Sequence, residues 1–234
     1  MDSWSSAAPV GRTRTAEFMA SVYRWMGFGL ALTGIVAWAV TSTPSLLILF
    51  YRVEEGRIVG SAPAMWIALI GWFLLGIAFS PVALRASLGA AVAMFLTFCA
   101  LSGVVFSSIV FQYTGASIGS TLFVTAGAFF AVSVYGTVTK RNLDSWRSFL
   151  FIGLVGIILA SIVNFFLRSN AVEFVVSCAG VLIFAGLTAY DTQKLRAMAE
   201  HGEERHALIG ALALYLDFVN LFLFLLRFMG RRRE

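Results

Sequence analysis

The sequence predicts an all-α integral membrane protein, a bundle of seven transmembrane helices. Hydrophobic residues make up 59% of the 234 residues and charged residues only 12%, whereas charged residues form about a quarter of a typical soluble domain. The apolar residues gather in seven runs, most of them close to the roughly 20 residues that a helix needs to cross a bilayer. These runs lack the alternation of transmembrane β-strands and are longer than such strands, so we expect helices rather than a barrel.

The seven predicted spans follow one another through short connections, at residues 18–40, 64–80, 88–111, 118–139, 148–167, 171–190 and 207–229. The second run is the shortest, and Pro81 is expected to mark its end because proline interrupts a helix. The segment from Leu46 to Tyr51 is apolar but too short to span, so we interpret it as an interfacial extension before a polar loop. We expect residues 1–17 to form an N-terminal arm and residues 18–234 to form a single transmembrane domain.

The basic residues predict the orientation of the bundle in the membrane. Ten of them fall on the side of the N-terminus: Arg12, Arg14, Arg24, Arg85, Lys140, Arg141, Arg147, Lys194, Arg196 and Arg205. The opposite connections carry only Arg52, Arg57 and Arg168. Because lysine and arginine stay preferentially in the cytoplasm, we predict a cytoplasmic N-terminus. With seven spans the basic tail, residues 231–233, then lies outside; the alternative is that one run re-enters the membrane without crossing it.

Composition also bears on partners and cofactors. The net charge of +5 comes from residues at the ends of apolar runs, where the positive-inside rule places them, so the expected partner is the lipid bilayer and not nucleic acid. Cys99 and Cys178 both lie inside apolar runs and are interpreted as buried free thiols. Glycines are scattered through the spans without the spacing of a phosphate-binding loop, which favours close helix packing. No cofactor is expected.

An acidic residue inside the last span is the strongest functional signal. Asp217 lies in the middle of the run 207–229, and Asn220 follows one turn later. A carboxylate at that depth is disfavoured by several kcal/mol and normally faces the protein interior with a partner. Asp191, at the end of the sixth run, is the candidate partner. Arg85, in the turn after the second run, is expected on the same side of the membrane as Asp191.

Spacing by itself leaves the meeting of the two acids open. If the last helix starts at the membrane boundary, Asp217 lies roughly 15 Å deep. The two aspartates then meet only if the last helix begins outside the bilayer or the sixth ends inside it. The alternatives are that Asp191 is an interfacial helix-end carboxylate, that Asp217 bonds Asn220 or a neighbouring helix for packing, and that Arg85 is an ordinary cytoplasmic anchor.

If the acids do meet, they predict a site for protons or calcium. Two carboxylates in a poorly solvated site repel each other, so they titrate as a unit and share a proton unless a cation intervenes. Calcium accepts carboxylate, amide and water oxygens, and two carboxylates would bind it weakly, as conduction requires. An arginine latched on a carboxylate would close the cytoplasmic mouth. We therefore predict Asp191 and Asp217 as pH sensor, ion gate and weak calcium ligands, with Arg85 as the latch.

Two segments form recognisable motifs: Leu214 to Phe228, LYLDFVNLFLFLLRF, in the last span, and Ala189 to Lys194, AYDTQK, at the end of the sixth. They resemble the last-helix signature and the helix-six signature of the Bax inhibitor family, the transmembrane Bax inhibitor motif proteins. Ser102-Gly103 and Gly136-Thr137 also fit. Within these motifs Tyr190, Gln193 and Asn220 are expected to support the site.

This resemblance implies a bundle with the last helix at its centre. For bacterial members it also implies a pH-sensitive calcium leak across the inner membrane, governed by an aspartate pair like Asp191 and Asp217 and closed by a helix-two arginine, which matches Arg85. Bacterial relatives can carry several basic residues at this point, where this chain has Ala-Leu-Arg-Ala-Ser. The alternative function is a non-conducting regulator that binds membrane proteases or stress-response partners.

An enzymatic function is not expected. Tyr190-Asp191 matches half of the signature of an intramembrane aspartyl protease. The other half requires Gly-x-Gly-Asp, and Leu214-Tyr215-Leu216 stands before Asp217 instead.

Overall fold

The computed structural model describes residues 7–199 and 203–233, and in them seven helices are long and apolar enough to cross a membrane. These are α1 (Ala7–Ser42), α3 (Pro63–Ala83), α4 (Leu88–Gln112), α5 (Gly115–Val138), α6 (Arg147–Leu167), α7 (Asn170–Met198) and α8 (Glu204–Met229). The short elements between them are α2 (Pro44–Phe50), β1 (Tyr51–Glu54), β2 (Arg57–Ser61) and the 3₁₀ helix η1 (Leu143–Trp146). The predicted seven-span helical bundle is confirmed.

Several predicted boundaries are wrong, and each for a local reason. The first helix already begins at Ala7, so the segment predicted as an arm is helical from there; residues 1–6 lie outside the described residues. Pro81 lies inside α3, which continues for only two more residues and ends at Ala83, because proline removes its own backbone donor and disturbs the turn before it without forcing the chain out of the helix at once. The sixth span continues past Tyr190 to Met198, since its polar residues still form helix after the apolar run has ended.

A β-hairpin replaces the polar loop predicted after the first span. Strands β1 and β2 pair in antiparallel fashion, from Tyr51 opposite Ser61 to Glu54 opposite Arg57. Glu55 and Gly56 form the turn with φ angles of 51° and 76°, the left-handed values that a tight hairpin turn requires. The Tyr51 hydroxyl bonds the Ser107 hydroxyl at 2.7 Å. This contact ties the hairpin to the end of α4.

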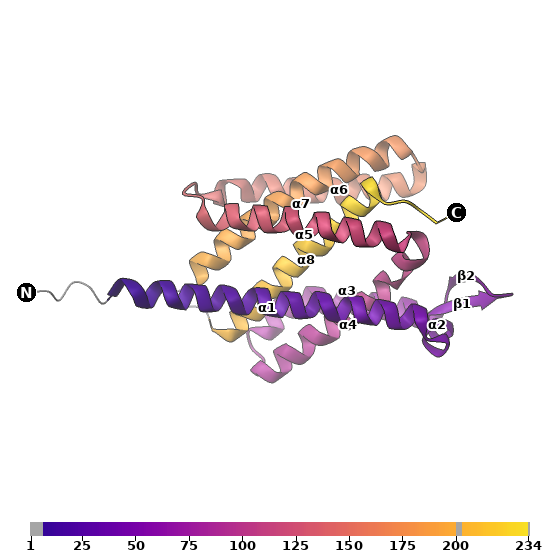
Figure 1. The fold of residues 1–234 in the computed structure, drawn as a ribbon, viewed down its shortest axis with the longest axis horizontal. Helices are drawn as coiled ribbons and strands as arrows, with labels where there is room; N and C mark the ends of the chain where they lie inside the picture. Colours follow the sequence, from indigo (N-terminus) through magenta and orange to yellow (C-terminus); the bar gives the residue numbers. More distant parts are fainter. Residues whose placement is uncertain (1–6, 200–202, 234) are drawn as a thin grey trace, which may run out of the picture.

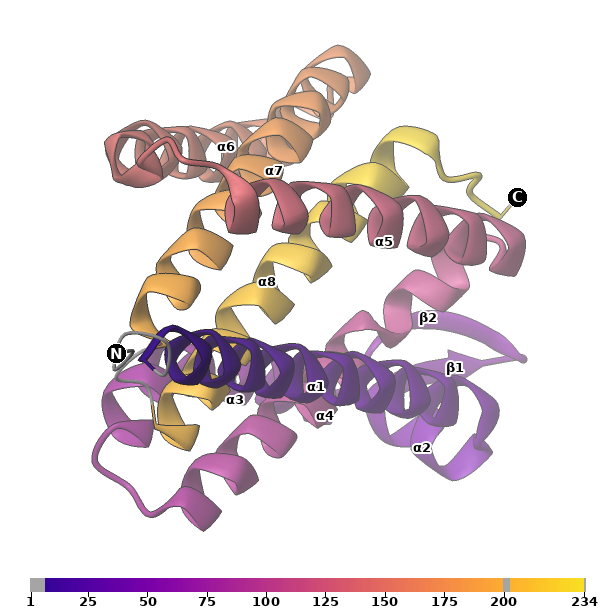
Figure 2. The same ribbon diagram turned by 60° about the vertical axis from the view of Figure 1, so that its left-hand side comes forward.

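Helix α8 runs through the centre of the bundle, as expected. It crosses the molecule diagonally behind α1 and α5 (Figure 2) and packs against α1, α3, α4, α5 and α7. It is also the most buried of the seven spans. Tyr215, completely buried, joins it to α1 through a 2.8 Å hydrogen bond to the Thr33 hydroxyl, which in turn donates to the Cys99 carbonyl oxygen at 2.9 Å.

Two glycines allow neighbouring helices to approach backbone to backbone. A side chain at Gly103 of α4 would collide with the Thr33 carbonyl oxygen of α1, and one at Gly136 of α5 would collide with the Ala189 carbonyl oxygen of α7. Small residues at helix crossings are how transmembrane helices gain close packing, because lipid offers no hydrophobic driving force between them. The second crossing lies only two residues before Asp191.

The chain ends on the side of the bundle opposite the N-terminus. Figure 1 shows the C-terminus at the same end as the β-hairpin, with the N-terminus at the other. The backbone of Arg231 accepts from Thr114 N at 3.1 Å and donates to the Ser117 hydroxyl at 2.9 Å. Arg232 pairs with Glu173 at 3.0 Å. We call these two surfaces the N-terminal side and the C-terminal side; the basic tail is bonded to the latter.

This placement predicts the outcome of a labelling experiment. In a Cys178→Ser background, in which Cys99 stays completely buried, single cysteines would replace three exposed residues, Glu55, Lys140 and Arg232. We expect the cysteines at positions 55 and 232 to react with a membrane-impermeant maleimide from the same face, and the one at position 140 from the opposite face. If the cysteine at position 232 is instead labelled from the same face as the cysteine at position 140, the tail does not lie on the C-terminal side.

Candidate functional site

Asp217 lies halfway along α8 and is buried, with only 5% of its surface exposed. Within the described part of the chain, its Oδ2 has no hydrogen-bond partner. Burying such a group without a partner is strongly unfavourable when it carries a charge. A bound proton or a cation would remove the cost of the buried charge at this position. Packing alone does not explain why a carboxylate is present there.

Helix packing directs Asp217 toward α7. Gly210, Asp217 and Phe224 are spaced seven residues apart, so they lie on one stripe of α8. The two flanking members both touch α7, where Gly210 packs on Leu195 and Phe224 packs on Gly180. Asp217 lies between these two contact points. The neighbouring Phe218 instead faces α5, where its ring meets that of Phe129.

The same contacts set the position of Asp191. In the antiparallel register that pairs Leu195 with Gly210 and Gly180 with Phe224, Asp191 is opposite a point near residue 214. That is about one helical turn, or roughly 5 Å along the axis, from Asp217. Asp191 is half-buried, and its charge acts repulsively on Asp217. The structure thus brings the two predicted acids near each other, which the spacing of the residues left open.

Thr192 adds a second buried oxygen without a partner next to the aspartates in the sequence. It is completely buried, and its hydroxyl oxygen makes no hydrogen bond within residues 7–199 and 203–233. In the same part of the chain no group of three or more histidine, cysteine or carboxylate side chains comes together. A cation at this site would therefore have the two aspartates as its only charged ligands, with neutral oxygens and water completing the shell, which suits weak calcium binding.

The three residues predicted to support the site have other neighbours. Asn220 donates to the Leu216 carbonyl oxygen of its own helix at 2.8 Å. Gln193 accepts from Leu143 N at 2.8 Å and donates to the Arg141 carbonyl oxygen at 2.9 Å, so it holds the connection between α5 and α6. Tyr190 lines a cavity of about 550 Å³ against α6. These contacts belong to the packing around the aspartate pair, and none of them joins the three residues to either carboxylate.

Arg85 is exposed in the turn between α3 and α4, and the ion pairs of the described residues do not include it. The predicted contact with the aspartates is therefore not formed in this conformation. Arg205, in the first turn of α8, donates instead to the carbonyl oxygens of Leu84 and Ala86, at 3.4 and 3.1 Å. The arginine that joins the α3–α4 turn to the central helix is thus Arg205.

In the sequence, Arg205 contributed only to the predicted topology, because the last span was expected to begin at residue 207, after this arginine. Helix α8 instead begins at Glu204, which puts Arg205 in its first turn, where the helix dipole disfavours a basic residue that lacks acceptors elsewhere. Arg196 near the end of α7 is similar: it donates to the Thr137 carbonyl oxygen at the end of α5. Both arginines donate hydrogen bonds to carbonyl oxygens near helix ends on the N-terminal side.

Comparison with known proteins yields matches along nearly the whole chain. The model of the family described as inhibitor of apoptosis-promoting Bax1 matches residues 15–234. The inner membrane protein YbhL of Escherichia coli strain K12 is 44% identical over 229 residues, 95% of this chain and 94% of that protein. An uncharacterized protein of Caulobacter vibrioides is 39% identical over 233 residues, 93% of this chain and 90% of that protein. The protein RP147 of Rickettsia prowazekii is 39% identical over 223 residues, covering 93% and 91%.

Proposed function

The chain belongs to the Bax inhibitor family, and from this premise we propose that it is a pH-sensitive, calcium-permeable leak channel of the inner membrane. The observation that carries the proposal is the buried Asp217 carboxylate, whose Oδ2 has no partner in the described part of the chain and which lies about one helical turn from Asp191 in the register of α7 against α8. An ionised side chain in the middle of a membrane span raises the free energy of insertion by several kcal/mol, and such residues mark ion and proton pathways.

The proposed chemistry is competition between protons and calcium for the aspartate pair. With both carboxylates ionised, the pair carries two negative charges and attracts a divalent cation. A proton removes one of these charges and weakens that attraction. Lower pH therefore favours the protonated pair and reduces calcium occupancy, whereas higher pH favours calcium. Because only two charged ligands are present, binding stays weak enough for the ion to leave.

We place the gate at the α3–α4 turn on the N-terminal side. Arg205 bonds the backbone on either side of Arg85, so this turn moves with α8 as long as those bonds hold. In the proposed cycle, release of the turn lets the Arg85 guanidinium reach Asp191 and latch the mouth. Calcium binding at the pair competes with the latch, because it neutralises the charge that holds the arginine. A proton also weakens the latch, but it removes the charge that attracts calcium, and we expect this loss of calcium to govern the flux.

The proposed orientation has the N-terminal side in the cytoplasm. The support is the excess of basic residues on that side, ten against three in the connections of the C-terminal side and three more in its tail, residues 231–233, and the positive-inside rule. The inner membrane is proposed because the similar YbhL is an inner membrane protein. The latch at Arg85 and the exposed Lys140 would then face the cytoplasm, so the channel would respond to cytoplasmic pH.

Reconstitution into liposomes that contain a calcium dye tests the proposal. We expect wild-type protein to admit calcium faster than protein-free liposomes do, and the rate to fall as the pH is lowered through the range in which the pair gains a proton. Asp144→Asn is the matched control, because Asp144 is an exposed acid on the N-terminal side, outside the spans' interior. This variant is expected to behave as wild type.

A preparation that is folded but admits no more calcium than empty liposomes at any pH would contradict the proposal. That result would favour the non-conducting alternative, a regulator of membrane proteases or stress-response partners. For that function, partner co-purification should persist when both Asp191 and Asp217 are replaced by asparagine.

A further inference from the structure

A cleft between α1 and α5 opens toward the lipid and has α8 as its floor. The two helices do not pack along each other; each packs on α8 instead. Figure 2 shows α8 crossing behind the space between them. One cavity, of about 570 Å³, lies between Tyr23 of α1 and the second half of α5. A second, of about 650 Å³, extends along α1 from Leu30 to Trp38.

The two cavities adjoin each other, and we call them together the α1–α5 cleft. Ala126 of α5 and Phe218 of α8 line both of them. Their volumes lie within the roughly 300 to 1,000 Å³ of small-molecule sites. The cleft therefore has room for a ligand along the length of two helices.

The lining of the larger cavity selects an apolar occupant. Its residues on α4, α5 and α8 are hydrophobic, among them Phe106, Leu122 and Phe222. Its one hydroxyl, that of Thr33, is already engaged by the Cys99 carbonyl oxygen and Tyr215. Water is not retained in such a cavity, because it needs two to four polar partners. In a bilayer the neighbouring solvent at this depth is lipid hydrocarbon, so an acyl chain fits.

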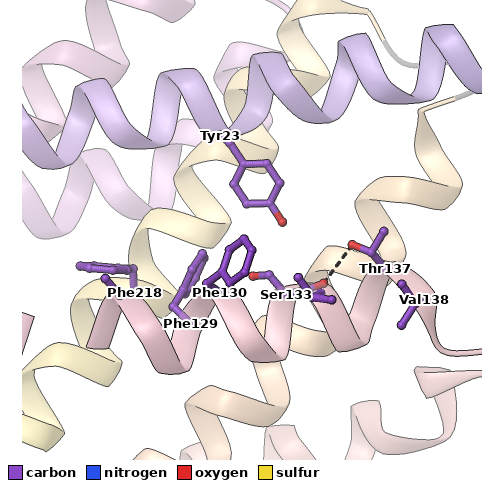
Figure 3. A pocket seen from close by; sticks show the side chains of 9 residues that line it. Tyr23, Phe129, Phe130, Ser133, Thr137, Val138 and Phe218 are labelled. Atoms are coloured by element: carbon purple, nitrogen blue, oxygen red, sulfur yellow. Dashed lines mark hydrogen bonds between the residues drawn. The ribbon is translucent and has the colours of Figure 1, made fainter. Parts of the chain in front are cut away.

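The smaller cavity has a polar end that apolar packing does not explain. Ser133 is only 4% exposed and lines this cavity, yet its hydroxyl has no partner within the described residues. Figure 3 shows Tyr23 reaching from α1 toward α5 with its hydroxyl directed toward Ser133 and Thr137. Thr137 uses its own hydroxyl to donate to the Ser133 carbonyl oxygen at 2.9 Å. Buried hydroxyls without partners are rare in folded proteins, which points to an acceptor supplied by a ligand.

The position of this polar end matches the ester region of a lipid. Thr137 is in the last turn of α5, which ends at Val138, so the hydroxyls lie near the N-terminal side of the bundle. Lys140 and Arg141 follow immediately and are exposed. Ester carbonyl oxygens accept hydrogen bonds from hydroxyls, and a phosphate beyond them would reach the basic residues of the interface. The apolar part of the cleft runs from here toward the middle of the membrane.

We propose that the α1–α5 cleft binds one phospholipid, with an acyl chain along α8 and an ester carbonyl at the hydroxyls of Tyr23 and Ser133. The lipid would come from the leaflet on the N-terminal side. It would cover the face of α8 that α1 and α5 leave open, directly beside Asp217. This site is separate from the aspartate pair, because Phe218 faces the cleft while Asp217 faces α7.

Native mass spectrometry of the detergent-purified protein titrated with palmitoyl-oleoyl phosphatidylglycerol tests this site. Gly34→Leu should fill the larger cavity, since Gly34 lines it and a Cβ there meets no atom within 4 Å. We expect the affinity of the first bound lipid to fall about tenfold or more. Gly127→Leu is the matched control: Gly127 is also exposed on a span with open space around it but does not line the cleft, so its affinity should equal that of wild type.

Two further variants probe the junction and the polar end. Ala126→Leu, at a residue that lines both cavities, should weaken binding of the first lipid as Gly34→Leu does. Ser133→Ala removes one hydrogen bond and is expected to weaken it about two- to tenfold. Thermal melts of each variant verify that the fold is intact. Equal lipid affinity in Gly34→Leu, Ala126→Leu and Gly127→Leu would overturn the proposal. It would also be overturned if the wild-type protein were a dimer that Gly34→Leu converts to monomers, because a second copy of the chain would then cover the cleft.

Discussion

Asp217→Asn is expected to reduce calcium passage about tenfold or more and to remove most of its dependence on pH. Asparagine has nearly the same size and keeps the carbonyl oxygen, but it carries no charge and takes up no proton. Losing one unit charge beside a cation removes roughly 1 to 4 kcal/mol of attraction, depending on the local dielectric, which corresponds to between about a fivefold and about a thousandfold change in occupancy. Asp191 alone would then titrate without a close acidic neighbour.

The fold of this variant should be retained or strengthened. Asp217 Oδ2 has no hydrogen-bond partner within the described residues, so the replacement breaks no hydrogen bond at that oxygen and removes a buried negative charge near Asp191. The asparagine amide can donate a hydrogen bond where the carboxylate could only accept one. We therefore expect a melting temperature equal to or above that of wild type. Asp144→Asn provides the control for the loss of an acid elsewhere.

The measurement is calcium entry into dye-containing liposomes at acidic, neutral and alkaline pH, with the protein content of each preparation matched. If Asp217→Asn passes calcium at the wild-type rate and with the wild-type pH profile, the aspartate pair is not the gate. A loss of flux accompanied by a lower melting temperature would instead indicate damage to the bundle, and it would contradict the expectation that Asp217 is free of structural contacts.

Gly136→Ala is expected to have the largest effect on stability. The added methyl group would collide with the Ala189 carbonyl oxygen of α7. This is a backbone atom, so no change of side-chain rotamer can relieve the collision. Overpacking of this kind destabilises by roughly 1 to 3 kcal/mol, which corresponds to a fall in melting temperature of roughly 3 to 10 °C for a chain of this size. Relief requires α7 to move away from α5, and Asp191 moves with it, so calcium passage should fall as well.

Two glycines on the same helix provide the matched controls. Gly119 and Gly127 are exposed on α5, and an added Cβ meets nothing within 4 Å at either position. Alanine at either should leave the melting temperature unchanged or raise it slightly, because alanine favours helix more than glycine does. Thermal unfolding in one detergent compares all three variants. If the melting temperature of Gly136→Ala equals that of Gly119→Ala and Gly127→Ala, then α5 and α7 do not approach as closely as the structure indicates.

The candidate site shows where prediction from sequence stops. Asp217 could be singled out because a charged residue inside an apolar span is anomalous wherever the neighbouring helices lie. Its approach to Asp191 could not be predicted, because it depends on the register of α7 against α8, which Gly210 on Leu195 and Gly180 on Phe224 determine. Topology and family resemblance both placed Arg85 at this site. In the structure Arg205 holds the turn, since hydrogen bonds to carbonyl oxygens depend on where helix ends meet.

What the sequence determined by itself is the number and approximate extent of the spans, because hydrocarbon forces each crossing segment to be apolar and to satisfy its own backbone hydrogen bonds within a helix. Helix ends were less predictable: α7 continues from Tyr190 to Met198 because polar residues at the interface form helix as readily as apolar ones. Only the tertiary structure decided the register of α7 against α8, which residues hold the tail from Arg231 to Arg233, and that a cleft stays open between α1 and α5. These features depend on contacts between residues far apart in the chain, and those contacts follow from the shapes of whole helix faces, which local composition does not encode.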